Sequence, residues 1–177
     1  ALSGVARVLV HAGKLSAKAA EDLARGAKER RASFASAVIS AGAVQPSDLA
    51  HTLSTALALP LLDLNAVDLN RLPRGIVEPK LALQYQLIVL GKRGNRLFIG
   101  AADPTDQEAV ERIKFATQLS PEWVIVEYDK LVRILETQGA NVNEAMESLA
   151  GGDFEFDVTD DSTAAQDSAE VSQEVED

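Results

Sequence analysis

The chain has 177 residues, a length that suits one ordinary domain or two small ones. It begins with Ala rather than Met, from which we expect an excised piece of a longer protein. It contains no Cys, which excludes disulfides, thiolate metal sites and Cys nucleophiles. No apolar run is long enough to span a membrane and no signal segment opens the chain, so we expect a cytoplasmic protein without direct membrane insertion.

The net charge of −10 is concentrated at one end of the chain. Residues 151–177 hold ten Asp and Glu and no Lys or Arg, which leaves 17 acids and 17 bases in residues 1–150. Because residues 151–177 are also rich in Gly, Ser and Thr, we interpret them as a disordered acidic linker or tail. The remainder is neutral, so the sequence predicts no nucleic-acid partner.

Residues 1–58 are rich in Ala and have the apolar periodicity of helices. The predicted helices cover 4–13, a stretch capped by Ser16, 33–42, and a stretch that starts near Pro46. Gly13 and Gly42 lie 29 residues apart, and each follows an apolar helix. We therefore predict two copies of a helix–Gly–helix hairpin, which pack together as a bundle because neither can bury its apolar face alone.

The next segment, 59–75, has a different composition, with Leu residues separated by Asp, Asn and Pro. This pattern interrupts any long helix and predicts an ordered connector with one short turn. We interpret Asp63 and Asp68 as turn-forming residues rather than as a carboxylate pair, because Asp side chains bond readily to nearby backbone N–H groups.

Residues 76–138 alternate between helical and strand-like patterns. The predicted elements are a short helix near Pro79, strands over 87–90 and 97–101 joined by a turn at 92–95, a helix over 104–118, a strand over 122–129 and a helix over 128–139. This order predicts a small α/β sandwich with a sheet of about three strands, and therefore an α+β fold for the whole chain. Residues 139–150 are predicted to form a short helix or a linker.

The stretch HAGKLS (His11–Ser16) contains the Gly-Lys pair of a phosphate-binding loop but not its other residues. A Walker loop needs a further Gly upstream and Ser or Thr directly after the Lys, whereas Leu15 follows Lys14 here. The two histidines, His11 and His51, are not at metal-ligand spacing within one helix. We therefore predict no catalytic, cofactor-binding or metal-binding residue and no enzyme activity in this chain.

An acidic turn joins strand to helix in LFIGAADPTDQEAVERIKFAT, residues 97–117. Acids at the start of a helix would repel a phosphate, but they accept hydrogen bonds from its free N–H groups. Pro104 restricts Asp103 to extended backbone, and Thr105 with Glu108 has capping-box spacing. We predict that the turn is structural and caps the helix through Asp103, Pro104, Thr105, Asp106 and Glu108.

The order of elements over 71–118, with AADPTD at 101–106 and IKFAT at 113–117, resembles the N-terminal domain of type II secretion and type IV pilus assembly ATPases. The similarity covers roughly residues 5–138 and is strongest to the ATPases that extend pili. It implies a parent protein that is a hexameric ring ATPase. ATP and magnesium would bind only in a motor domain downstream of 151–177, so no cofactor is expected in this chain.

The same resemblance implies a regulatory domain that docks other proteins at the bacterial inner membrane. The implied partners are a PilZ-type adaptor and the inner-membrane assembly-platform proteins, and the chain itself is expected to be monomeric. Candidate docking residues are apolar side chains that the hairpins leave exposed: Val8, Leu15, Val38, Ile39 and Val44. That all five belong to the core stays an open alternative.

Some members of the family bind cyclic-di-GMP through helical repeats that carry R-L-G and a closing Gln. This chain keeps the apolar frame of the repeat: Leu9, Gly13, Leu15, Val38, Gly42 and Val44. It has Gly4-Val5-Ala6 and Ser33-Phe34-Ala35 in place of R-L-G, and Ala27 and Ala56 in place of Gln. Without those Arg side chains we expect no direct binding. The alternatives are a cyclic-di-GMP sensor that uses Arg7, Arg30 or Arg31, and an enzyme of unrecognised chemistry.

Overall fold

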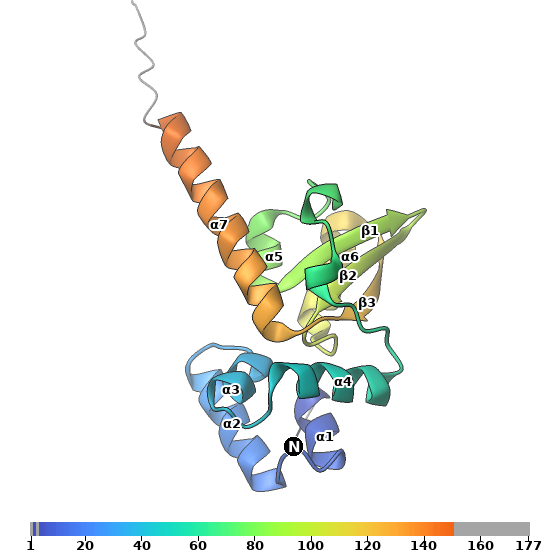
Figure 1. The fold of residues 1–177 in the computed structure, drawn as a ribbon, viewed down its shortest axis with the longest axis vertical. Helices are drawn as coiled ribbons and strands as arrows, with labels where there is room; N and C mark the ends of the chain where they lie inside the picture. The colour runs from blue at the N-terminus through green and yellow to red at the C-terminus, as the bar shows by residue number, and fades with distance from the viewer. Residues whose placement is uncertain (1, 3, 151–177) are drawn as a thin grey trace, which may run out of the picture.

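A computed structural model describes residue 2 and residues 4–150 of the chain. The helical part comprises α1 (Gly4–His11), α2 (Ala17–Glu29), α3 (Phe34–Ser40) and α4 (Pro46–Leu57). The α/β part comprises η1 (Leu64–Ala66), η2 (Leu69–Arg71), α5 (Pro79–Tyr85), β1 (Leu87–Arg93), β2 (Arg96–Ala101), α6 (Gln107–Thr117), β3 (Ser120–Ile125) and α7 (Tyr128–Ala150). The helical part lies against the end of the α/β part where α7 begins, and α7 points away from it (Figure 1). The predicted α+β fold is confirmed.

The two hairpins of the helical part repeat one backbone geometry. Gly13 (φ 72°) and Gly42 (φ 65°) adopt the left-handed conformation that glycine tolerates after a helix. In the first copy, Lys14 N donates to Leu9 O over 2.9 Å, and in the second Ala43 N donates to Val38 O over 3.1 Å. The bonds are 29 residues apart, as the repeat requires, and the prediction of two helix–Gly–helix copies is confirmed.

Helix starts in the helical part follow their local chemistry. The Ser16 side chain accepts a hydrogen bond from Ala19 N over 3.1 Å, which confirms Ser16 as the cap of α2. Ser33 caps α3 in the same way, and Pro46 occupies the first turn of α4. The core of this part contains fully buried side chains from three of its helices together with Ile125 at the end of β3: Leu9, Val38, Leu49, Leu53 and Ile125.

The sheet has the strand order β1-β2-β3, with β1 antiparallel and β3 parallel to the central β2. The hairpin turn is shorter than predicted because cross-strand pairing continues to Arg93 and Arg96, which leaves only Gly94 (φ 61°) and Asn95 as the turn. The third strand begins earlier than predicted, since Ser120 already pairs with Arg96, and it ends at Ile125 rather than at 129.

Both faces of the sheet are covered. Leu87, Leu97 and Ile99 face one side and form a buried cluster with Ile113 of α6, against which side chains of α5 pack. Ile88 faces the other side and is buried with residues of η1 and α7, in a second cluster that contains Leu64, Ile88, Val126, Leu131 and Leu135. The predicted α/β sandwich is therefore present, with α5 and α6 on one face and the connector and α7 on the other.

The connector between the two parts contains two short 3₁₀ turns where one turn was predicted. Asp63 Oδ1 accepts from Asn65 N over 2.9 Å, and Asp68 Oδ1 accepts from Asn70 N over 3.1 Å. The interpretation of both Asp residues as turn formers is confirmed. Just before the first turn the connector pairs with β3: Ile125 N donates to Pro60 O over 2.8 Å, and Leu62 N donates to Ile125 O over 2.9 Å.

The last helix differs from its prediction. We expected one helix to end at Gly139 and a separate short helix or linker to follow, but α7 continues without a break to Ala150. Glycine ends a helix when it adopts left-handed backbone, and Gly139 does not. It only weakens the helix, by about 1 kcal/mol relative to Ala. The predicted acidic linker, 151–177, lies outside the described residues.

Candidate functional site

The acidic turn at 103–106 is a structural corner. Asp106 caps α6, because its Oδ1 accepts from Ala109 N over 3.2 Å. Asp103 Oδ1 accepts from Thr105 N over 2.8 Å and so stabilises the turn before the helix. The predicted capping box of Thr105 and Glu108 is wrong: α6 begins one residue later than that spacing requires, and Glu108 instead accepts a hydrogen bond from Tyr85 Oη over 2.8 Å.

The corner also lies against Gly4, the first residue of α1. Pro104 is buried, and a Cβ added to Gly4 (φ 52°) would overlap Thr105 Oγ1. Burial raises the pKa of Asp103, while hydrogen bonds from the Thr105 hydroxyl and backbone N–H oppose that rise. Within residues 4–150 no group of three or more His, Asp or Glu is placed to hold a metal ion. The corner therefore joins the start of α1 to the α/β part.

The five candidate docking residues divide into two groups. Val38 and Val44 are 0% and 6% exposed, so the expectation that they are left exposed is wrong. Both lie in the helical core, because the two hairpins pack these faces together. Val8, Leu15 and Ile39 are half-buried against the same core and keep part of their apolar surface in solvent. Their role in docking stays a prediction.

The three arginines of the alternative hypothesis are all exposed. Arg7 lies on α1 and its Nη2 donates to Leu2 O over 2.9 Å. Arg30 is the C-terminal cap of α2, and Arg31 follows it with φ 53°. These side chains therefore come from the surface of the first hairpin and from the loop that leads into the second.

A polar bridge that the sequence did not reveal joins the helical part to the α/β part. Ser33 Oγ donates to Gln86 Oε1 over 3.1 Å, and Gln86 Nε2 donates to Tyr128 Oη over 3.3 Å. Gln86 ends α5 in left-handed backbone (φ 51°), and Tyr128 is the first residue of α7. The Tyr128 ring also packs against the helical core. The start of α7 is thus held by residues of both parts.

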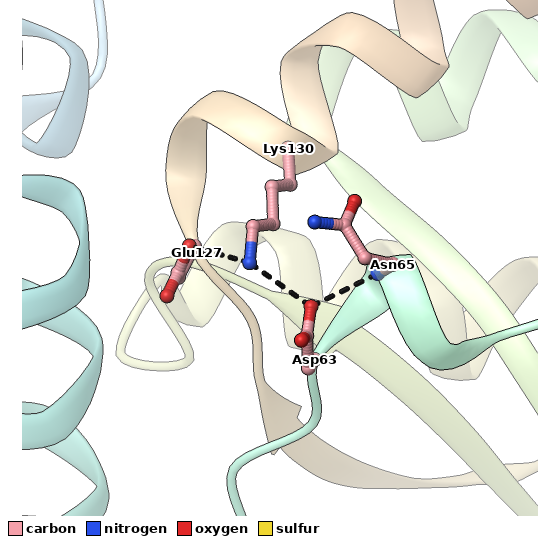
Figure 2. Close-up of polar contacts among 4 residues, drawn as sticks. All are labelled: Asp63, Asn65, Glu127 and Lys130. Atoms are coloured by element: carbon pink, nitrogen blue, oxygen red, sulfur yellow. Dashed lines mark hydrogen bonds and ion pairs between the residues drawn. The ribbon is translucent and has the colours of Figure 1, made fainter.

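A second contact ties the same end of α7 to the connector (Figure 2). Lys130 Nζ lies 2.9 Å from Asp63 Oδ1 and 3.0 Å from Glu127 Oε2. Hydrogen bonds from Lys130 and from the backbone N–H of Asn65 lower the pKa of Asp63, and the two carboxylates raise the pKa of Lys130. This group holds the start of α7 against the connector.

Comparison with known proteins agrees with this architecture. Residues 57–137 match the family model of the MshEN domain, a stretch that contains the whole sheet and the packed half of α7. This part of the chain is an MshEN domain. The chain as a whole is homologous to the N-terminal region of the type IV pilus assembly ATPase PilB, so the predicted family resemblance is confirmed.

The similarity to PilB extends over nearly the full chain. The chain is 31% identical over 173 residues to PilB of Pseudomonas aeruginosa, covering 96% of this chain and 31% of the relative. It is 32% identical over 133 residues to PilB of Acinetobacter baylyi, covering 75% of this chain and 23% of the relative. The chain therefore spans less than a third of the length of these curated relatives.

Two solved structures share the fold. One is the structure of MshE with cdg, at 24% identity and a TM-score of 0.56, covering 77% of this chain and 99% of that one. The other is the N-terminal domain of XpsE, at 24% identity and a TM-score of 0.60, covering 75% of this chain and 91% of that one.

Among the described residues, no helix combines the length and the hydrophobicity that a membrane crossing requires.

Proposed function

We propose that this chain is the regulatory and docking domain of a type IV pilus assembly motor. The observation that carries the proposal is the position of Tyr128. This residue starts α7, contacts the helical core and accepts a hydrogen bond from Gln86, which in turn bonds to Ser33 of the helical part. A partner that shifts the helical hairpins therefore acts on the helix that leads to the C-terminal remainder of the chain.

The proposed docking surface lies on the helical part and includes Val8, Leu15 and Ile39, which are half-buried. Exposed apolar atoms of this kind, supported by a rigid core, favour association with another protein. The proposed partners are a PilZ-type adaptor and the inner-membrane assembly platform. The domain then works at the cytoplasmic face of the inner membrane, and ATP hydrolysis belongs to a hexameric motor further along the parent protein.

The test measures binding of a PilZ-type protein to the full chain by isothermal titration. Replacing Ile39 with Ser removes an apolar contact from the proposed surface, and loss of an interface anchor costs about 1.4 kcal/mol or more, which weakens binding at least about tenfold. Phe115→Ser is the matched control, because Phe115 is 80% exposed on α6, outside the helical part. Its affinity should equal that of the unaltered chain.

Because Ile39 also packs against the core, thermal unfolding of each variant must show that the helical part is still folded. Leu15→Ser provides a second variant from the other hairpin. Unchanged affinity in both folded variants would remove the helical part as the docking surface.

A second candidate function is cyclic-di-GMP sensing, and the observation that favours it is the similarity to the structure of MshE with cdg. Arg7, Arg30 and Arg31 would supply the positive charge that phosphates require. Titration of the chain with cyclic-di-GMP separates the two functions. Binding with a micromolar dissociation constant that is lost in an Arg7→Ala or Arg30→Ala variant supports sensing. If no binding is measured, protein docking remains the proposed function.

A further inference from the structure

A cavity of about 310 Å³ lies between the connector, α5, β1 and α7. Its lining is largely apolar, with Leu72, Val77 and Leu87 among its walls, and it includes Arg74 and Asn141. Its size is at the lower end of the range of about 300–1,000 Å³ that is usual for sites that receive a ligand. All of its lining residues belong to the connector and the α/β part, and no residue of the helical hairpins lines it.

An apolar stripe on α7 leads from this cavity to the end of the described chain. Val142 lines the cavity and is 39% exposed, Met146 is 65% exposed and Leu149 is 77% exposed. Spacings of four and three residues put these side chains on one face of the helix. In Figure 1 this half of α7 extends beyond α5 and the sheet, without a neighbouring element. The described chain stops at Ala150, one residue after the stripe.

The sequence that follows has the composition to cover this face. Residues 151–158 read Gly-Gly-Asp-Phe-Glu-Phe-Asp-Val. Two glycines after a helix allow the backbone to reverse direction. In an extended segment, Phe154, Phe156 and Val158 then point to one side, and the acidic residues between them point to the other.

We propose that residues 154–158 fold back along α7, so that Phe154 covers the α7 stripe and Phe156 enters the cavity. The distances agree. An extended chain advances about 3.3 Å per residue and a helix about 1.5 Å. If the chain reverses so that Gly152 lies level with Ala150, the last residue of α7, Phe154 reaches about 7 Å back, level with Met146, and Phe156 about 13 Å back, level with Asn141 at the cavity.

Charge favours the same occupant. Residues 151–177 contain ten acids and no base, and Arg74 at the cavity takes part in none of the ion pairs found among the described residues. Glu155 and Asp157, which alternate with the two Phe residues, bring negative charge to that guanidinium. A segment with this alternation therefore matches an apolar cavity with a basic residue in its wall.

The test uses the full chain and a single nitroxide label, which the absence of Cys makes possible. The label is attached to Glu155→Cys, on the acidic side of the segment. The chain has one Met, so the Met146 methyl gives one assignable NMR signal on the stripe. We expect the label to broaden this signal and those of the Val142 methyls, independently of protein concentration. A label at Ser172→Cys, far along the tail, is the matched control and should leave most of the intensity of the Met146 and Val142 methyl signals.

Adding Phe154→Ser and Phe156→Ser to the labelled chain should restore the Met146 signal. The proposal is overturned if the label at position 155 causes no broadening, or if broadening survives the two Ser substitutions. It is also overturned if broadening increases with protein concentration, because a second copy of the chain then covers the stripe. None of these readouts depends on a PilZ-type partner or on cyclic-di-GMP, so the result is independent of the proposed function.

Discussion

Gly100, in the central strand β2, offers a sharp test of how the sheet supports α7. A Cβ at this position would lie 2.8 Å from Ile88 Cγ2, 3.2 Å from Val126 Cγ1 and 3.4 Å from Leu90 Cδ1. The first two distances are shorter than ordinary van der Waals contacts, so Gly100→Ala must displace Ile88 or Val126. Both are buried on the face that α7 covers.

The expected cost follows from these distances. Forcing a methyl group into a packed core costs about 1–3 kcal/mol. Replacing Gly with Ala in an unstrained strand recovers about 0.5–1 kcal/mol by restricting the unfolded chain. The middle of each range gives a net destabilisation of about 1 kcal/mol, which in a chain of this size lowers Tm by about 2–4 °C.

Gly91→Ala is the matched control. Gly91 lies in the neighbouring strand β1, where a Cβ would have no heavy atom within 4 Å. Thermal unfolding followed by circular dichroism should show Gly91→Ala at or slightly above the Tm of the unaltered chain, and Gly100→Ala below it. A Gly100→Ala variant as stable as the original, or an equal loss in both variants, would refute the packing argument.

Three further variants test the contacts that orient α7 and α6, each by urea unfolding. Tyr128→Phe leaves Gln86 Nε2 without its acceptor and should cost about 1 kcal/mol; no loss would mean that the bond contributes nothing. Asp106→Ala removes the cap of α6 and should cost about 0.5–2 kcal/mol of stability. If Thr105 were the cap instead, this substitution would cause no loss of stability. The pKa of Asp63 is lowered from 3.8 by Lys130, so its stabilisation is present above about pH 4 and is lost as pH falls through the folded-state value. Asp63→Asn should flatten the stability curve below about pH 4, and an unchanged curve would exclude this contact.

Features with local chemistry could be predicted from the sequence. Ser16 and Pro46 start their helices where expected, because an N-cap hydroxyl and a first-turn Pro act on neighbouring backbone. The positive φ of Gly13 and Gly42 follows from the same reasoning. The 29-residue repeat then placed the helices of the two hairpins without any tertiary information.

Features that depend on tertiary packing could not be predicted. Gln86 and Tyr128 are separated by 42 residues, and neither side chain signals its partner. The burial of Val38 and Val44 depends on which face of each hairpin meets the other copy. The cap of α6 moved to Asp106 because Thr105 is already bonded to Asp103 in the preceding turn, and two residues that can both cap a helix do not reveal which one does.

Ile125 ties the two parts into one cooperative unit. Its backbone pairs with the connector and with β2, while its side chain is fully buried in the helical core. Cutting the chain after residue 58 would expose Ile125 and the ring of Tyr128 together, so the α/β part should lose solubility when separated. A chimera that takes its helical hairpins from another chain must therefore carry a surface that fits Ile125, or its first hydrophobic core remains incomplete.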